Sequence, residues 1–165
     1  MAGIINFVGK SNTGKTTLIT KVISYICHQG YSVGVIKHDV HDFEIDHKEK
    51  DTYKHKEAGA STVIISNRKK YALIKDVEEE ASLEDLIELC QDKDIIIIEG
   101  YKKSPYDKIE LLREERYKEP ISDRRYLKAI ACDFDISIDD ENIENFDIDD
   151  FESVGNFIIN NYILQ

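Results

Sequence analysis

The chain has 165 residues, of which 41% are apolar, and carries a net charge of −11. That length suffices for one domain with a hydrophobic core, and no apolar run reaches the ~20 residues that a membrane-spanning helix needs. The charge is uneven, because residues 1–128 hold all 22 Lys and Arg residues, whereas ten of the 33 Asp and Glu residues lie within 133–152. This charge distribution argues against non-specific binding to nucleic acid, which needs a basic surface. Since no secretion signal opens the sequence, we expect a cytoplasmic protein that binds neither nucleic acid nor membrane.

Apolar periodicity predicts alternating strands and helices along the chain. A strand over 3–8, a helix over 15–28 and a strand over 32–37 form the unit typical of parallel sheets. The β-branched run at 94–98 predicts a strand buried on both faces. The other expected elements are helices at about 52–58, 82–90 and 149–163 and strands at 61–66, 71–75, 108–112 and 127–131. We predict a single α/β domain, 1–165, with a mostly parallel central sheet flanked by helices and an acidic C-terminal segment at about 133–165.

One motif follows the first strand and opens the first helix. It fits G-x-x-x-x-G-K-[ST] and consists of Gly9, Lys10, Ser11, Asn12, Thr13, Gly14, Lys15 and Thr16. Backbone N–H groups of such a loop and of the helix N-terminus attract anions. Lys15 can reach the β- and γ-phosphates of a nucleotide, and the Thr16 hydroxyl can bind Mg²⁺. The motif in this context predicts a P-loop NTPase-like fold.

A carboxylate is also needed at the metal, and P-loop proteins usually place it at the end of a buried strand. Glu99 directly follows the run 94–98, on the side of the sheet where parallel strands form the binding crevice. No motif identifies the base of the nucleotide, because the N-K-x-D motif of GTP-binding switch proteins is missing. The motifs therefore do not choose between GTP and ATP.

The segment KHDVHDFEIDH, residues 37–47, collects His and acidic residues after the second strand. Three interpretations stay open. It is a solvated polar loop, a site for a divalent metal, or a nucleotide-responsive or substrate loop in which Asp39 orients an attacking or metal-bound water.

Several segments together resemble one known family. They are the motif at 9–16, which we call the phosphate loop, and the segments VGVIKHDVHDFEID (33–46), KDTYKHKEAGA (50–60) and IIIIEGYKKSPYDKIELLR (95–113). Over residues 3–131 the chain resembles MobB, the molybdopterin-guanine dinucleotide biosynthesis protein B family. The resemblance implies a GTP-binding protein with weak GTPase activity that forms homodimers through its sheets. It also implies a partner, the molybdenum cofactor guanylyltransferase, which attaches GMP to molybdopterin.

The resemblance also implies roles for individual residues. Gly14, Lys15, Thr16 and Thr17 would bind the nucleotide phosphates, and Asp39 and Glu99 would face Mg²⁺. The characteristic loop of the family would include His38, His41 and Asp42. Lys102 and Lys108 suit an anionic phosphate or a molybdopterin-type ligand.

Two other functions stay open from the residues. A P-loop small-molecule kinase would need arginines that clamp the transferred phosphate, and the candidates are Arg113, Arg116, Arg124 and Arg125. A nucleotide-gated metallochaperone would carry its metal on the segment 37–47. Lys10 stands where dimeric P-loop ATPases place a lysine that reaches the partner's nucleotide, so we expect it to face a neighbouring subunit.

Overall fold

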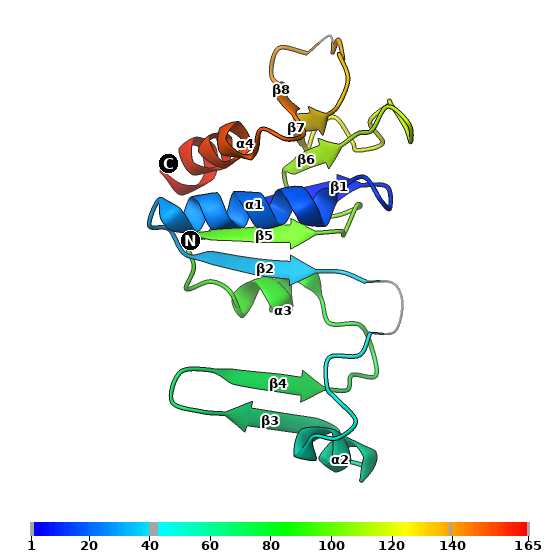
Figure 1. Ribbon diagram of the computed structural model, residues 1–165, viewed down its shortest axis with the longest axis vertical. Coiled ribbons are helices and arrows are strands. Elements are labelled where there is room, and N and C mark those ends of the chain that lie inside the picture. Colours follow the sequence, from blue (N-terminus) through cyan, green and yellow to red (C-terminus); the bar gives the residue numbers. More distant parts are fainter. Residues whose placement is uncertain (1, 40–42, 139, 165) are drawn as a thin grey trace. The chain divides into compact units, whose positions relative to one another are not determined.

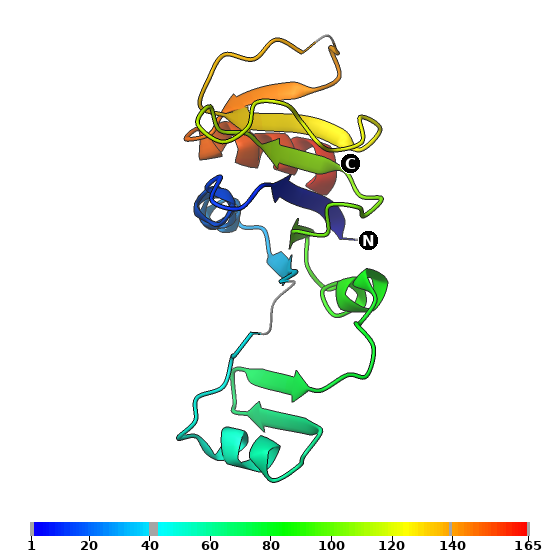
Figure 2. The ribbon, with the colours of Figure 1, turned by 90° about the vertical axis from the view of Figure 1, so that its right-hand side faces the viewer.

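The computed structural model describes residues 2–39, 43–138 and 140–164. The chain divides into two compact units, one made of residues 1–38 and 84–165 and the other of residues 39–83 (Figures 1 and 2). Each unit is described by itself. The candidates His41 and Asp42 lie outside the described residues.

The first unit is built on a six-stranded sheet with the order β2-β5-β1-β6-β7-β8. Every neighbouring pair in it is parallel, as the strand–helix–strand pattern predicts. The strands are β1 (Gly3–Gly9), β2 (Val33–Lys37), β5 (Ile95–Glu99), β6 (Lys108–Leu111), β7 (Leu127–Cys132) and β8 (Glu144–Asp147). The apolar side chains of β5 are fully buried, which confirms the prediction of a central strand.

Helices cover both faces of this sheet. On one face lie α1 (Lys15–His28) and α4 (Phe151–Ile158), which continues as a π-helical turn (Ile159–Ile163); they pack against each other and share a core with β1, β5 and β6 (Figure 1). On the other lies α3 (Leu83–Glu88) (Figure 2). No helix within the described residues combines the length and apolar character needed to cross a membrane.

The strand β8, which lies inside the acidic segment, is not predicted by the sequence pattern. Its sequence, Glu-Asn-Phe-Asp, has low strand propensity, and only its Phe146 is partly buried. The strand forms because it pairs with β7 at the edge of the sheet, where charged side chains also discourage further pairing. The acidic segment is therefore partly built into the fold.

The carboxyl ends of these strands come to one edge of the sheet. Gly9 pairs with Leu111, Leu111 with Ala131, and Ala131 with Phe146, so these four residues form one row across the sheet. In open α/β sheets ligands bind beyond this edge. The phosphate loop, which begins at Gly9, lies at that edge.

The second unit is a small hairpin with one helix. It contains α2 (Asp51–Glu57), β3 (Thr62–Ser66) and β4 (Tyr71–Lys75). The two strands are antiparallel, and α2 packs against β3. The predicted strands at 61–66 and 71–75 are thus confirmed, but they form a separate two-stranded sheet.

Candidate nucleotide-binding site

The phosphate loop needs glycine at its two fixed positions. Gly9 has φ 148° and Gly14 has φ 89°, values that side chains with a Cβ rarely adopt. A Cβ on Gly9 would lie 2.9 Å from the carbonyl oxygen of Leu111. Asn12 also has positive φ, at 61°, which Asn tolerates better than most residues. The loop thus wraps tightly before α1, whose first N–H groups have no intrahelical acceptor and no side-chain cap within the described residues.

Lys15 folds back over this loop. Its Nζ donates to the carbonyl oxygens of Lys10 at 2.7 Å and Gly9 at 3.2 Å. Burial lowers the pKa of Lys15 from its usual value, and the positive charges of Lys102 and Lys37 lower it further, while Glu99 opposes them. An anion placed among these lysines would stabilise the charged form of Lys15. The arrangement therefore favours binding of a polyphosphate.

Thr16 and Glu99 meet beside the loop. The Thr16 hydroxyl donates to Oε1 of Glu99 at 3.0 Å, although 83 positions separate the two residues. Glu99 is the last residue of β5 and is only 9% exposed. The structure therefore brings together the two candidate Mg²⁺ ligands that the motif and the strand end predict.

Two further lysines act on the same site. Lys37 ends β2 and lies in register with Glu99, and Lys102 is exposed in the turn after β5. Lys102 is a candidate from the sequence, whereas Lys37 is not. The signal for Lys37 was its place at the carboxyl end of a parallel strand, next to the site edge.

The segment after Glu99 is held in an unusual conformation. Tyr101 has φ 42°, and its ring stacks on that of His38, with centroids 4.4 Å apart. The backbone N–H of His38 donates to the carbonyl oxygen of Glu99 at 2.9 Å. His38, a candidate from the sequence, is thus tied to the segment that carries Glu99 and Lys102.

Lys108 is neither a solvated lysine nor an open anion ligand. It is 1% exposed, its Nζ donates to the carbonyl oxygens of Ser104 and Tyr106, and it lies over the ring of Tyr126. Burial lowers its pKa, and the charge of Asp107 opposes this shift. Lys108 therefore holds the loop between β5 and β6.

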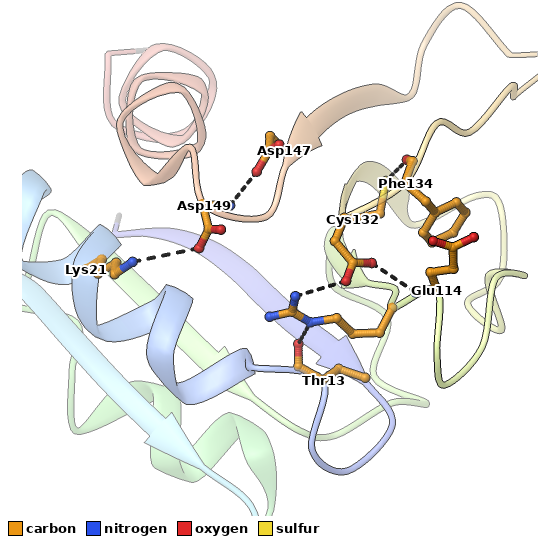
Figure 3. A network of polar contacts seen from close by, with 9 residues as sticks. Thr13, Lys21, Glu114, Cys132, Phe134, Asp147 and Asp149 are labelled. Carbon is orange, nitrogen blue, oxygen red and sulfur yellow. Dashed lines mark hydrogen bonds and ion pairs between the residues drawn. The ribbon is translucent and has the colours of Figure 1, made fainter.

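Arg113 links the phosphate loop to the segments that follow β6 and β7. Its Nε donates to the carbonyl oxygen of Thr13 at 3.1 Å, and its Nη1 donates to Asp133 at 3.1 Å. The other oxygen of Asp133 accepts from the backbone N–H of Glu114 at 2.9 Å. The network around Thr13 and Glu114 is drawn in Figure 3. Of the four arginines considered for a kinase lid, Arg113 alone contacts the loop among the described residues.

A further candidate Mg²⁺ ligand from the sequence is Asp39. Asp39 is exposed and is the first residue of the second unit, so its place near Mg²⁺ stays a prediction. Among the residues outside 1, 40–42, 139 and 165, no group of three or more His, Cys, Asp or Glu side chains could hold a metal ion.

Lys10 has a contact within its own chain. Its Nζ lies 4.4 Å from the centre of the Tyr117 ring, while the phenol of Tyr117 donates to Glu110 at 2.8 Å. Burial and this hydrogen bond raise the pKa of Tyr117, which keeps the ring neutral. The contacts that shape the loop use the carbonyl of Lys10, not its side chain.

We therefore expect Lys10→Ala to leave nucleotide affinity within about fivefold of wild type, since it removes a cation–π contact of about 0.5–1 kcal/mol. Its effect should appear in hydrolysis or in coupling between subunits, as the sequence predicts. Calorimetry and phosphate release measured on the same preparation test this. A loss of affinity as large as that of Lys15→Ala would show that both lysines bind the same nucleotide.

Comparisons with known proteins identify the relatives of this chain. Residues 4–133 match the family described as molybdopterin guanine dinucleotide synthesis protein B, MobB. A molybdopterin-guanine dinucleotide biosynthesis adapter protein of Escherichia coli is 34% identical, over 96% of this chain and 93% of its own length. One from Haemophilus influenzae is 33% identical, over 82% and 78%. The crystal structure of Bacillus subtilis MobB superimposes with a TM-score of 0.75 at 26% identity, covering 99% of each chain. These matches confirm the P-loop NTPase-like fold class and the resemblance seen in the sequence: the chain belongs to the MobB family.

Proposed function

We propose that this chain binds GTP with Mg²⁺ at the phosphate loop, hydrolyses it slowly, and acts in the cytoplasm as an adapter for the guanylyltransferase that attaches GMP to molybdopterin. The observation that carries the proposal is the hydrogen bond between Thr16 and Glu99 beside the phosphate loop. The names of its relatives supply the adapter role. The exposed Lys102 suits the phosphate of a molybdopterin-type ligand.

The donor set fits Mg²⁺. A hydroxyl and a carboxylate are oxygen ligands, and Mg²⁺ is usually held by one or two carboxylates together with waters and substrate phosphates. Bound there, Mg²⁺ would neutralise charge on the β- and γ-phosphates. The N–H groups at the start of α1 and the ammonium of Lys15 would bind the same phosphates, with Lys37 and Lys102 adding positive charge.

Slow hydrolysis is supported by the position of Arg113. Fast GTPases place an arginine on the transferred phosphate. Here the guanidinium of Arg113 is held by the carbonyl of Thr13 and by Asp133.

A cavity at the carboxyl ends of β7 and β8 supports guanine over adenine. Its volume is about 430 Å³, and its lining includes Asp133, Phe134, Asp135, Phe146 and Asp147. Aromatic rings offer stacking surfaces to any base. Ionised carboxylates only accept hydrogen bonds. The Watson–Crick edge of guanine presents two neighbouring donors, N1–H and the amino group. Adenine has an acceptor, its N1, in place of the N1–H of guanine.

Calorimetry with GTP and ATP, each with and without Mg²⁺, tests the proposal directly. We expect GTP to bind more tightly than ATP, Mg²⁺ to strengthen binding, and phosphate to be released without any added acceptor. Turnover that appears only with an added hydroxyl substrate would replace the proposal by a kinase. A wild-type protein that binds no nucleotide would overturn it.

We also propose that the chain is a homodimer and that the hairpin takes part. On one face of β3 and β4, Val63 is buried. On the other, Ile64 pairs with Leu73, and both are exposed, at 64% and 49%, next to Tyr71 at 76%. Because a two-stranded hairpin is marginally stable alone, a second copy covering this face would stabilise it.

The variant Leu73→Lys tests this. A charge placed in the buried centre of such an interface should shift the protein to monomers at micromolar concentration, as measured by analytical ultracentrifugation. The control is Arg68→Ala in the hairpin turn, which should keep the wild-type mass. A monomeric wild type, or a Leu73→Lys variant with unchanged mass, would contradict the proposal.

A further inference from the structure

The carbonyl group of Thr13 receives one contact from far along the chain. Nε of Arg113 donates to it at 3.1 Å across 100 positions, and Thr13 itself is fully buried. Nη2 of the same guanidinium lies close to Gly14. A Cβ added to Gly14 would be 3.0 Å from this nitrogen. One planar group therefore lies against both residues of the peptide that ends the phosphate loop.

The direction of this carbonyl determines the direction of an amide. A peptide group is planar and trans, so its C=O and its N–H point in opposite directions. Arg113 draws the carbonyl of Thr13 toward β6 and β7, and the N–H of Gly14 consequently points away from Arg113. That N–H belongs to the turn whose amides form the anion-binding nest.

The guanidinium is itself fixed. Nη1 is bound to Asp133, the first residue after β7, and Asp133 is held by the N–H of Glu114 (Figure 3). The arginine fork can satisfy Thr13 and Asp133 at once, whereas a lysine is a point charge that cannot match this geometry. The choice of arginine is therefore specific.

We propose that Arg113 is a positioning residue for phosphate binding, which aims the N–H of Gly14 at the bound polyphosphate and depends on Asp133 for its own orientation. The inference rests on the proposed binding of GTP at this loop. It explains why an arginine follows β6 and why the acidic segment begins with an aspartate.

The test compares Arg113→Lys with wild type, using GTP and inorganic triphosphate as probes in calorimetry with Mg²⁺. We expect about a tenfold loss of affinity, of similar size for both probes. The reason is that a change in the direction of the Gly14 N–H weakens contacts to the phosphates and not to the base. The unfolding midpoint should match that of Arg125→Lys. This control makes the same change at an ion pair with Asp123 in the same connecting segment, and it should bind GTP like wild type.

A second pair of variants covers the case in which Arg113→Lys does not fold. Asp133→Asn keeps an oxygen for Arg113 and should bind triphosphate more tightly than Asp133→Ala does. Wild-type affinity in Arg113→Lys, or equal affinity in the two Asp133 variants, would overturn the inference while leaving GTP binding intact. A wild-type protein that binds neither probe would overturn the proposed function and this inference with it.

Discussion

Replacing Lys15 with Ala is expected to lower GTP affinity about 10- to 100-fold, the effect of losing hydrogen bonds from a charged group to phosphate. Lys15 lies over the loop on the carbonyls of Gly9 and Lys10, from which it can turn to the β- and γ-phosphates. Burial and the nearby charges of Lys102 and Lys37 disfavour its charged form. Glu99 offsets this only in part, since the pKa of Lys15 is still lowered, and a triphosphate would add further opposite charge. Calorimetry with Mg²⁺-GTP measures the loss.

The matched control is Lys21→Ala on the same helix. Lys21 contacts Asp149 at 3.9 Å, and both side chains are largely exposed, so the pair contributes little. The control should bind GTP within about twofold of wild type. Equal affinity of Lys15→Ala and Lys21→Ala would show that the loop does not bind phosphate through Lys15.

The second large effect is expected at Glu99. The variant Glu99→Gln keeps an oxygen that can accept from Thr16 but removes the negative charge. Apparent Mg²⁺ affinity in the presence of GTP should fall about 10- to 100-fold, the range seen when groups around a bound metal are replaced. Hydrolysis should slow with it. Without Mg²⁺, GTP should bind as well as to wild type or better, because the carboxylate no longer repels the phosphates.

These opposite signs separate a metal role from a folding role. A variant that merely misfolds would lose affinity under both conditions. Glu114→Gln is the control, since Glu114 forms an exposed pair with Lys118 and should leave the Mg²⁺ dependence unchanged. If Glu99→Gln titrates with Mg²⁺ like wild type, the assignment of Glu99 to the metal is wrong.

Elements with a strong local pattern could be predicted from the sequence. The boundaries of α1 agree with its apolar spacing from 15 to 28, and β5 agrees with its β-branched run. β8 could not be predicted, because pairing with β7 stabilises it rather than its own composition. Nor did the sequence indicate that β3 and β4 form a separate antiparallel sheet, since the residues of a strand do not specify which strand it pairs with.

The sequence by itself determined the phosphate loop and its context, because the chemistry resides in residues that are neighbours in the chain. It also indicated the MobB family through motifs that need no structure to be recognised. Only the tertiary structure decided which distant side chains complete the site. It brings Glu99 to Thr16 and Arg113 to Thr13, and it buries Lys108 on backbone carbonyls. The reason is physical: parallel strands bring their carboxyl ends to one edge, and the order of strands in the sheet, which no local pattern encodes, selects which of those ends are adjacent.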